Sequence, residues 1–287
     1  MPADFTTIID VQTLHARLED PSLVIVDTRF NLMNVDEGRT AYLSAHIPGA
    51  LYAHLDDDLS GPPLTDAGRH PLPSPEALEA LFSRLGVDAD SQVVVYDQRD
   101  GMIAARLWWM LRYMGHTAVA VVDGGWKAWT AAAYATASGT ETRAASVFHG
   151  QPRREWLVTV DEIPAAQRLI DSRDARRYRG EQEPLDPVAG HIPGAFNRAY
   201  GESLDEDGHF LAAPELADGL RQLLAGTPVE EAVFYCGSGV TACHGLLAAC
   251  HAGLGNGRLY VGSWSEWCSD PGRPVATGAD PGILAGG

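Results

Sequence analysis

Short apolar runs alternate with helical patterns along the chain. The runs SLVIVD (22–27), QVVVYD (92–97) and TAVAVVD (117–123) are rich in Val and Ile, as in strands buried on both faces of a parallel sheet. Between them, SPEALEALFSRLG (74–86) and MIAARLWWMLRYMG (102–115) both end in Gly, and the first also begins with Ser-Pro. These signals predict helices. The alternation predicts an α/β fold in which a mainly parallel sheet is flanked by helices.

The chain contains an internal duplication. Four blocks of the first half recur in the second half in the same order, at offsets of 144, 145, 139 and 138 residues. The pairs are SLVIVDTR (22–29) with AQRLIDSR (166–173), HIPGA (46–50) with HIPGA (191–195), VVVYD (93–97) with AVFYC (232–236), and VDGGWKAW (122–129) with YVGSWSEW (260–267). A steady offset over four blocks indicates two copies of one domain.

A stretch without periodicity separates the two copies. Residues 136–156 (TASGTETRAASVFHGQPRREW) are mostly small or polar, which is typical of a linker. We therefore predict an N-terminal domain over residues 1–137, a linker over residues 138–156 and a C-terminal domain over residues 157–287.

Composition and charge exclude several classes of partner. With 21 Lys and Arg against 38 Asp and Glu, the net charge is −17, so we expect no nucleic-acid partner. No basic region followed by an apolar stretch marks a signal peptide, and no apolar run reaches the roughly 18 residues of a membrane span. All four cysteines fall in the last fifth of the chain, unlike a disulfide framework. We expect a monomeric, cytoplasmic protein with reduced thiols.

The two copies differ at the residue that follows a matched strand. The first copy has Asp97 there, and the second has Cys236, inside YCGSGVTACH (235–244). Cys236 lies between a strand and the start of a helix, where open α/β sheets bind anions. Gly237 and Gly239 allow backbone N–H groups to turn inward, and such donors would stabilise a thiolate or a persulfide. The pattern indicates an active second copy and a supporting first copy.

HIPGA, the paired Trp-x-x-Trp segments and CGSGVTA (236–242) resemble the tandem-domain rhodanese-type sulfurtransferases. The resemblance covers nearly the whole chain and implies two tandem rhodanese-like domains, the first of them non-catalytic. It implies that Cys236 accepts a sulfane sulfur as a persulfide and passes it to a thiol, thioredoxin or cyanide, without metal or organic cofactor. The loop is similar to that of the 3-mercaptopyruvate type. Ser238 is then expected in catalysis, and the residues expected to bind the small anionic donor are Gly237, Gly239, Val240, Thr241 and Ala242.

Arginines follow the first apolar strand of the second copy. By resemblance, Arg177 matches the arginine that binds the donor anion, and a guanidinium group suits carboxylate or sulfonate oxygens. Arg173 recurs as Arg29 in the first copy, which favours a structural ion pair with the neighbouring Asp. The 3-mercaptopyruvate type has a second arginine nine residues after the first, where this chain reads Leu185-Asp186. Thiosulfate therefore stays open as the donor.

Two interpretations are open for the histidines of HIPGA. His46 and His191 recur in both copies, which favours a structural role in the turn. The resemblance also implies a proton relay in which a histidine of the first half acts with an aspartate and the loop serine. On that interpretation, His46 and Asp36 act with Ser238.

Other functions are less compatible with the sequence. A cysteine phosphatase of related fold needs Cys-x5-Arg, but position 242 is Ala. A non-catalytic binding or sulfur-relay module would not need the intact Cys236 loop. Cys243 and Cys250 are seven residues apart and share a helix face, as do His244 and His251. No second cluster completes a set of four ligands, which favours core packing over a metal site.

Overall fold

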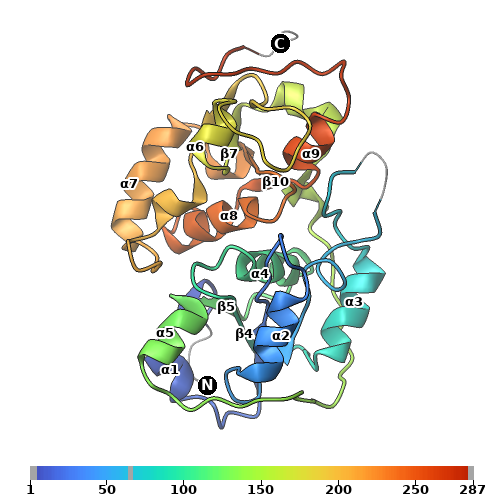
Figure 1. Ribbon diagram of the computed structural model, residues 1–287, viewed down its shortest axis with the longest axis vertical. Helices are drawn as coiled ribbons and strands as arrows, with labels where there is room; N and C mark the ends of the chain where they lie inside the picture. The colour runs from blue at the N-terminus through green and yellow to red at the C-terminus, as the bar shows by residue number, and fades with distance from the viewer. Residues whose placement is uncertain (1–4, 64–66, 284–287) are drawn as a thin grey trace. The chain divides into compact units, whose positions relative to one another are not determined.

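The computed structural model describes residues 5–63 and 67–283 (Figure 1). Unit 1 comprises the described parts of residues 1–61, 73–153 and 206–210, and unit 2 those of residues 62–72, 154–205 and 211–287. Each unit is built on a five-stranded sheet. The expected fold class, two tandem domains with parallel sheets flanked by helices, is confirmed.

The sheet of unit 1 has the order β1-β5-β4-β2-β3, and its described pairings are parallel. Its strands are β1 (Ile8–Ile9), β2 (Leu23–Asp27), β3 (Leu51–Tyr52), β4 (Gln92–Tyr96) and β5 (Val119–Val122). Its helices are α1 (Val11–His15), α2 (Glu37–Ser44), α3 (Pro75–Arg84), α4 (Ala104–Tyr113) and α5 (Gly125–Ala131). Strands β2, β4 and β5 are buried at every position, as the apolar runs predict for strands covered on both faces.

Local sequence sets the ends of α3. The Ser74 side chain accepts the N–H of Ala77, and Pro75 occupies the first turn, where its missing N–H is not needed. Gly86, just past the helix, has φ of +70°, which glycine adopts without strain. The helix predicted over residues 74–86 therefore begins and ends at the signals that predict it.

Helices cover both faces of the unit 1 sheet. Alternate strand residues such as Ile25 and Val94 pack with Leu14 of α1 and Trp129 of α5. Helix α4 contacts β4 and β5, and Figure 1 shows these strands between α4 and α5. The result is a three-layer α/β unit.

Unit 2 repeats this arrangement, with the strand order β6-β10-β9-β7-β8 and parallel described pairings. Its strands are β6 (Leu157–Val158), β7 (Arg168–Asp171), β8 (Ala195–Asn197), β9 (Ala232–Tyr235) and β10 (Arg258–Tyr260). Its α-helices are α6 (Ala175–Tyr178), α7 (Ala213–Leu224), α8 (Ala242–His251) and α9 (Ser263–Trp267). Short 3-10 helices span Arg154–Trp156, Val160–Ala165, Tyr200–Ser203 and Val229–Glu231.

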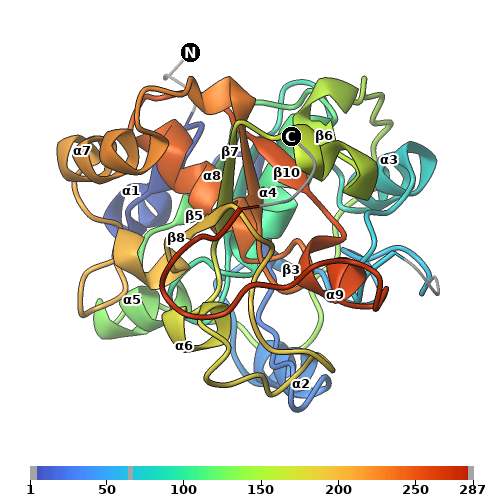
Figure 2. The ribbon, with the colours of Figure 1, turned by 90° about the horizontal axis from the view of Figure 1, so that it is seen from above.

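The faces of the unit 2 sheet are covered in the same way. Trp264 and Trp267 of α9 pack with Tyr178 of α6 and with strand residues such as Val233. Helix α8 contacts β9 and lies beside α7 (Figure 2). The recurring tryptophans therefore serve packing. Within the described residues, none of the helices combines the length and apolar character that crossing a membrane requires.

Two segments depart from a simple division into halves. Residues 62–72 come from the first copy but belong to unit 2, and residues 206–210 come from the second copy but belong to unit 1. In unit 1, Phe210 N–H donates to Asp123 Oδ1 at 2.8 Å. In unit 2, Arg69 N–H donates to Ser265 Oγ at 3.1 Å. The predicted domains, residues 1–137 and 157–287, do not include this exchange of segments between the two units.

Each unit contains the same buried ion pair. Arg29 Nη2 lies 2.6 Å from Asp27 Oδ2, and Arg173 Nη2 lies 2.6 Å from Asp171 Oδ2. Each guanidinium also lies 4.6 Å from the ring centroid of a tryptophan, Trp126 for Arg29. The structural ion pair expected from the repetition of Arg29 and Arg173 is confirmed.

We predict that Arg29→Met lowers the free energy of unfolding by about 3–5 kcal/mol, because it leaves the buried Asp27 carboxylate without its cation. Arg17→Met is the matched control, since the Arg17–Asp20 pair is partly exposed and such pairs contribute about 0–1 kcal/mol. Urea unfolding followed by tryptophan fluorescence measures both variants. Equal losses in the two variants would contradict a structural role for the buried pair.

Candidate active site

Cys236 follows the central strand of unit 2. Strand β9 is third in the five-strand order, and its carboxyl end leads through residues 236–241 into α8. The Cys236 residue is only 2% exposed. The sequence-based expectation of a strand, a short loop and a helix N-terminus around this cysteine matches the structure.

A turn at the start of α9 holds the Cys236 loop. Trp264 N–H donates to the carbonyl of Cys236 at 2.9 Å, and Ser265 N–H donates to the carbonyl of Gly237 at 2.9 Å. The amide N–H of Cys236 donates to Ser263 Oγ at 3.1 Å. Both sides of the nucleophile's backbone are therefore fixed by one turn.

Ser263 makes its contact from a strained backbone conformation. Its φ is +55°, a region that costs a residue with a side chain about 1–2 kcal/mol. The corresponding residue of unit 1 is Gly125, with φ of +54°. The second copy thus has a serine where the turn favours glycine, and the serine hydroxyl binds the amide of Cys236. Sequence analysis missed Ser263, although aligning GGW (124–126) with GSW (262–264) reveals the difference.

The loop has no room for a side chain at Gly239. Its φ is +75°, and a Cβ added there would lie 2.4 Å from the carbonyl oxygen of Val261. Val240 and Ala242 are buried, and Thr241, the N-cap residue of α8, makes no side-chain capping hydrogen bond in the described structure. In the first turn of α8, the N–H groups of Cys243 and His244 donate to the carbonyl oxygens of Val240 and Thr241 at 3.1 and 3.0 Å. The chain therefore passes from Cys236 into α8 through a tight loop that excludes a side chain at Gly239.

The corresponding loop of unit 1 is one residue longer, since six residues separate Asp97 from α4 and five separate Cys236 from α8, and its amides bind a carboxylate. Oδ1 of Asp97 accepts the N–H groups of Arg99 at 3.1 Å and Gly101 at 3.0 Å. Oδ2 accepts those of Ile103 at 2.8 Å and Ala104 at 3.1 Å. Burial, with a contribution from nearby Asp100, raises the pKa of Asp97 to about 6, while the backbone N–H groups favour its charged form. The unit 1 loop is an anion cradle that its own side chain fills.

Two arginines lie against the unit 2 loop. A Cβ added at Gly237 would lie 3.0 Å from Nη2 of Arg69 and 3.5 Å from Nη1 of Arg177. Arg177 Nη2 binds Glu183 Oε1 at 2.6 Å and Asp186 Oδ2 at 3.2 Å. Burial raises the pKa of Asp186 above its usual range, although the arginines favour its charged form. The loop is bordered by cations that buried carboxylates hold in place.

A histidine is bonded to the loop serine. Nδ1 of His70 lies 2.7 Å from Oγ of Ser238, and both residues are buried. His70, like Arg69, comes from the segment 62–72 that joins unit 2. Sequence analysis missed both residues, because this segment lies outside the four repeated blocks.

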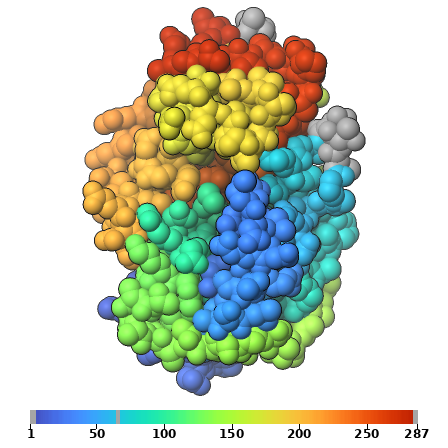
Figure 3. All heavy atoms as spheres, viewed as in Figure 1, coloured from blue at the N-terminus to red at the C-terminus, as the bar shows by residue number. Residues whose placement is uncertain are grey.

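The structure describes His46 and Asp36 within unit 1, and their predicted relay with Ser238 stays a prediction. The ring of His46 is fully buried in unit 1, where its Nδ1 lies 2.8 Å from the Tyr42 carbonyl oxygen. Asp36 is exposed at the start of α2, and this segment lies at the surface in Figure 3 (blue). The histidine that the structure places at Ser238 is His70, since it reaches the loop from within unit 2.

The remaining thiols lie in different surroundings. Cys243 and Cys268 are buried, and Cys250 is partly buried. Burial and the nearby Asp186 raise the pKa of Cys268 to about 11, so it is a neutral thiol at pH 7. Among the described residues, no group of three or more His, Cys, Asp and Glu side chains is placed to hold a metal ion.

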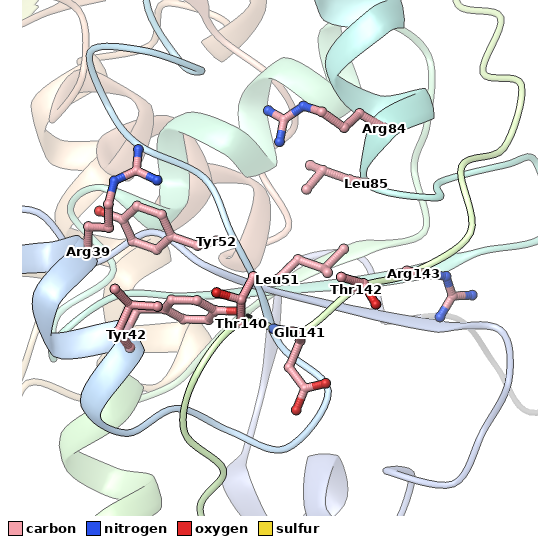
Figure 4. Close-up of a pocket in the computed structure, with 11 residues that line it drawn as sticks. Arg39, Tyr42, Leu51, Tyr52, Arg84, Leu85, Thr140, Glu141, Thr142 and Arg143 are labelled. Atoms are coloured by element: carbon pink, nitrogen blue, oxygen red, sulfur yellow. Dashed lines mark hydrogen bonds between the residues drawn. The ribbon is translucent and has the colours of Figure 1, made fainter.

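Unit 1 contains a separate cavity of about 400 Å³ (Figure 4). It lies among α2, β3, the end of α3 and residues 140–143. Arg39 and Arg84 line it, but these side chains already pair with Asp57 and Asp58. The cavity contains none of the predicted site residues, so the site rests on the loop of unit 2.

A family model of the rhodanese-like domain matches residues 10–132 and again residues 155–270. The chain belongs to the rhodanese family. The two matches correspond to the two copies of the duplication, so the resemblance seen in HIPGA and CGSGVTA is confirmed.

Named relatives of this rhodanese are sulfurtransferases. A protein of Pseudomonas aeruginosa named "Probable 3-mercaptopyruvate sulfurtransferase" is 46% identical over 278 residues, which cover 94% of this chain and 98% of the relative. A Mycobacterium tuberculosis protein named "Putative thiosulfate sulfurtransferase SseB" is 39% identical over 264 residues, covering 88% and 90%. The structure of 3-mercaptopyruvate sulfurtransferase from Leishmania major aligns with a TM-score of 0.81 at 32% identity, covering 91% of this chain and 74% of that chain.

We predict that Gly239→Ala lowers the free energy of unfolding by about 2–4 kcal/mol, because left-handed strain and steric overlap add together. Gly226→Ala is the matched control: Gly226 has φ of +91°, and a Cβ there would meet nothing within 4 Å. The control should lose only about 1–2 kcal/mol from backbone strain. Urea denaturation of both variants is the measurement, and a Gly239→Ala loss no larger than the control's would contradict the close packing at Val261.

Proposed function

We propose that this rhodanese is a sulfurtransferase that moves a sulfane sulfur from 3-mercaptopyruvate through a Cys236 persulfide to an acceptor. The acceptor is a small thiol, thioredoxin or cyanide. The relative that is 46% identical carries the 3-mercaptopyruvate name, and the loop sequence CGSGVTA suits the same donor.

The first half-reaction transfers sulfur to the enzyme. The Cys236 thiolate attacks the donor sulfur, a bond forms between Sγ and that sulfur, and the donor's C–S bond breaks. The electron pair of the broken bond leaves as the enolate of pyruvate, which takes up one proton to give pyruvate. The transferred sulfur keeps its hydrogen, so Cys236 becomes a persulfide. A covalent intermediate of this kind divides one transfer into two easier steps.

The second half-reaction regenerates the thiolate. An acceptor thiolate or cyanide attacks the outer sulfur, the S–S bond of the persulfide breaks, and Sγ leaves with the electron pair. A thiol acceptor becomes a persulfide, and cyanide becomes thiocyanate.

The observation that carries this proposal is the comparison of the two homologous loops. In unit 1, four backbone N–H groups bind the carboxylate of Asp97. In unit 2, the same strand–loop–helix arrangement has Cys236 at the position of Asp97, and the same kind of turn anchors its carbonyl. A loop shaped for an anion stabilises both the thiolate and the persulfide anion of Cys236.

We assign roles to the remaining site residues from their positions around the loop. Arg177 borders the loop at Gly237 and binds the donor anion. Ser238, bonded to His70, supplies the proton that the enolate takes up. When His70 carries a proton on Nδ1 it donates to Ser238 Oγ, and this leaves the serine hydrogen directed toward the donor.

We also propose a cytoplasmic monomer as the working form. All four cysteines are free thiols, which suits a reducing compartment. The net charge of −17 favours separation of copies by mutual repulsion.

We predict that Cys236→Ser abolishes sulfur transfer from either donor, whereas Cys250→Ser leaves it within about twofold, because the Cys250 thiol lies near the far end of α8, where it bonds residues 255 and 256. Steady-state assays with cyanide as acceptor compare 3-mercaptopyruvate with thiosulfate, and 3-mercaptopyruvate should give the larger kcat/KM. A larger kcat/KM for thiosulfate would overturn the donor assignment and leave the Cys236 chemistry intact. Activity retained by Cys236→Ser would overturn the mechanism.

We predict that Ser238→Ala and His70→Ala each lower kcat by about 10²-fold, the usual contribution of a positioned proton donor. Because the two residues act as one unit, the double variant should be no slower than the slower single variant. Single-turnover pyruvate release measures this step alone. If the reductions of kcat in the two single variants multiply in the double variant, the serine and the histidine act independently, which would contradict a joint role.

A further inference from the structure

The cavity of about 400 Å³ in unit 1 lies at the edge of the sheet (Figure 4). Strand β3 is last in the strand order of unit 1. The cavity lies among this strand, α2, the end of α3 and residues 140–143. Its volume is within the range of roughly 300–1,000 Å³ that small-molecule sites have. None of these elements carries the Cys236 loop, so a ligand bound here is separate from the proposed sulfur transfer.

Part of the cavity surface is apolar. Leu43, Leu51 and Leu85 line it, together with the ring of Tyr52. Leu51 and Leu85 are buried, but Leu43, on α2, is 43% exposed. Small-molecule sites are concave and mostly apolar, with a few polar groups that fix the orientation of the ligand. The exposed leucine therefore offers a surface that an apolar group can cover.

Two arginines from different helices line the same cavity. Nη2 of Arg39, on α2, lies 3.2 Å from Oδ2 of Asp57. Nη2 of Arg84, on α3, pairs with Oδ1 of Asp58. The two aspartates are consecutive, and consecutive Cα atoms lie only about 3.8 Å apart. The ion pairs therefore bring both guanidinium groups to one side of the cavity, as Figure 4 shows.

Both guanidinium groups remain accessible to a ligand. The side chain of Arg39 is 50% exposed and that of Arg84 is 56% exposed. Ion pairs between exposed side chains contribute little because water screens them, so the oxyanion of a ligand can share or replace the aspartates. The guanidinium carbon of Arg39 also lies 5.2 Å from the ring centroid of Tyr52. This contact keeps a cation beside the apolar part of the cavity.

The lining favours a negatively charged ligand. Nη1 and Nη2 of a third lining arginine, Arg143, bind the carbonyl oxygens of Leu23 and Pro21, each at 2.8 Å. Carbonyl oxygens carry no net charge, so these bonds leave the positive charge of Arg143 in place. Among the described residues that line the cavity, the acidic one is Glu141. Figure 4 shows its carboxylate on the opposite side of the cavity from Arg84.

We propose that this cavity binds an organic anion that has an apolar, ring-containing body and a carboxylate. The body covers Leu43, and the carboxylate accepts hydrogen bonds from Arg39 and Arg84. A guanidinium group matches a carboxylate in both charge and geometry, and covering the leucine removes apolar surface from water. Unit 1, whose own loop binds Asp97, thereby has a ligand of its own. The proposal does not depend on sulfur transfer at Cys236.

The test uses two probes that differ in the anionic group. 1-Naphthaleneacetate has a fused-ring body and a carboxylate, and 1-naphthaleneacetamide has a neutral amide in place of the carboxylate. Isothermal titration calorimetry should give a Kd of about 0.1 mM for the acid, as expected for a small ligand. The amide should bind at least about tenfold more weakly, since it lacks the charged hydrogen bonds.

Variants of unit 1 locate the bound probe. Arg84→Gln should weaken binding of 1-naphthaleneacetate by about tenfold through the loss of a charged hydrogen bond. Leu43→Gln should weaken it by about three- to tenfold through the loss of apolar contact. Arg221→Gln is the matched control, because Arg221 of unit 2 is equally exposed and also pairs with an aspartate, Asp218. The control should leave the Kd unchanged, and circular dichroism reports the folding of each variant.

Three results would overturn the site. One is equal affinity for the acid and the amide, which would show apolar binding without recognition of charge. Another is an affinity for the acid that neither Arg84→Gln nor Leu43→Gln changes, or no binding of the acid at about 1 mM. The third is weaker binding in Arg177→Gln but not in Arg84→Gln, which would place the probe beside the Cys236 loop of unit 2.

Discussion

The turn that opens α9 anchors both the Cys236 loop and the segment that carries Arg69 and His70. Ser263, Trp264 and Ser265 bind the backbone of Cys236 and Gly237 on both sides. The Ser265 hydroxyl also receives the amide of Arg69, which places His70 one residue further along. Cys236, His70 and Arg69 therefore share one structural reference point. Because reacting groups must be held to within a fraction of an ångström, a single rigid turn is an economical way to align them.

The duplication allows the same turn to be compared in a unit with Asp97 and in a unit with Cys236. Both units keep the same sheet order, buried Asp–Arg pair and carbonyl-anchoring turn, so the scaffold is common to both. The differences fall at the loop: Asp97 against Cys236, and Gly125 against Ser263. In unit 1, the carboxylate of Asp97 accepts hydrogen bonds from the N–H groups of its own loop. In unit 2 the thiol of Cys236 is smaller than this carboxylate, and in the proposed mechanism the loop amides stabilise the charge on its sulfur.

Much of this could be predicted from the sequence, for physical reasons. The duplication, the strands and α3 follow from periodicity and from capping signals, and Cys236 is conspicuous because the sister copy has an aspartate. The sequence does not identify the histidine that contacts Ser238. His46 and His191 contact equivalent carbonyl oxygens, of Tyr42 and Tyr178, each at 2.8 Å. His70 is 168 positions from Ser238, and no local pattern reports a contact made by a segment that joins the other unit.

In the proposed mechanism sulfur passes through Cys236 alone, and trapping the persulfide is the sharpest test. The enzyme is mixed with 3-mercaptopyruvate in the absence of an acceptor, and the reaction is quenched. The protein is then alkylated and digested, the mass of each cysteine-containing peptide is measured by mass spectrometry, and the released pyruvate is quantified. The account predicts one added sulfur on the Cys236 peptide for each pyruvate released. Sulfur on the peptides of Cys243, Cys250 or Cys268, or pyruvate released without protein-bound sulfur, would contradict it.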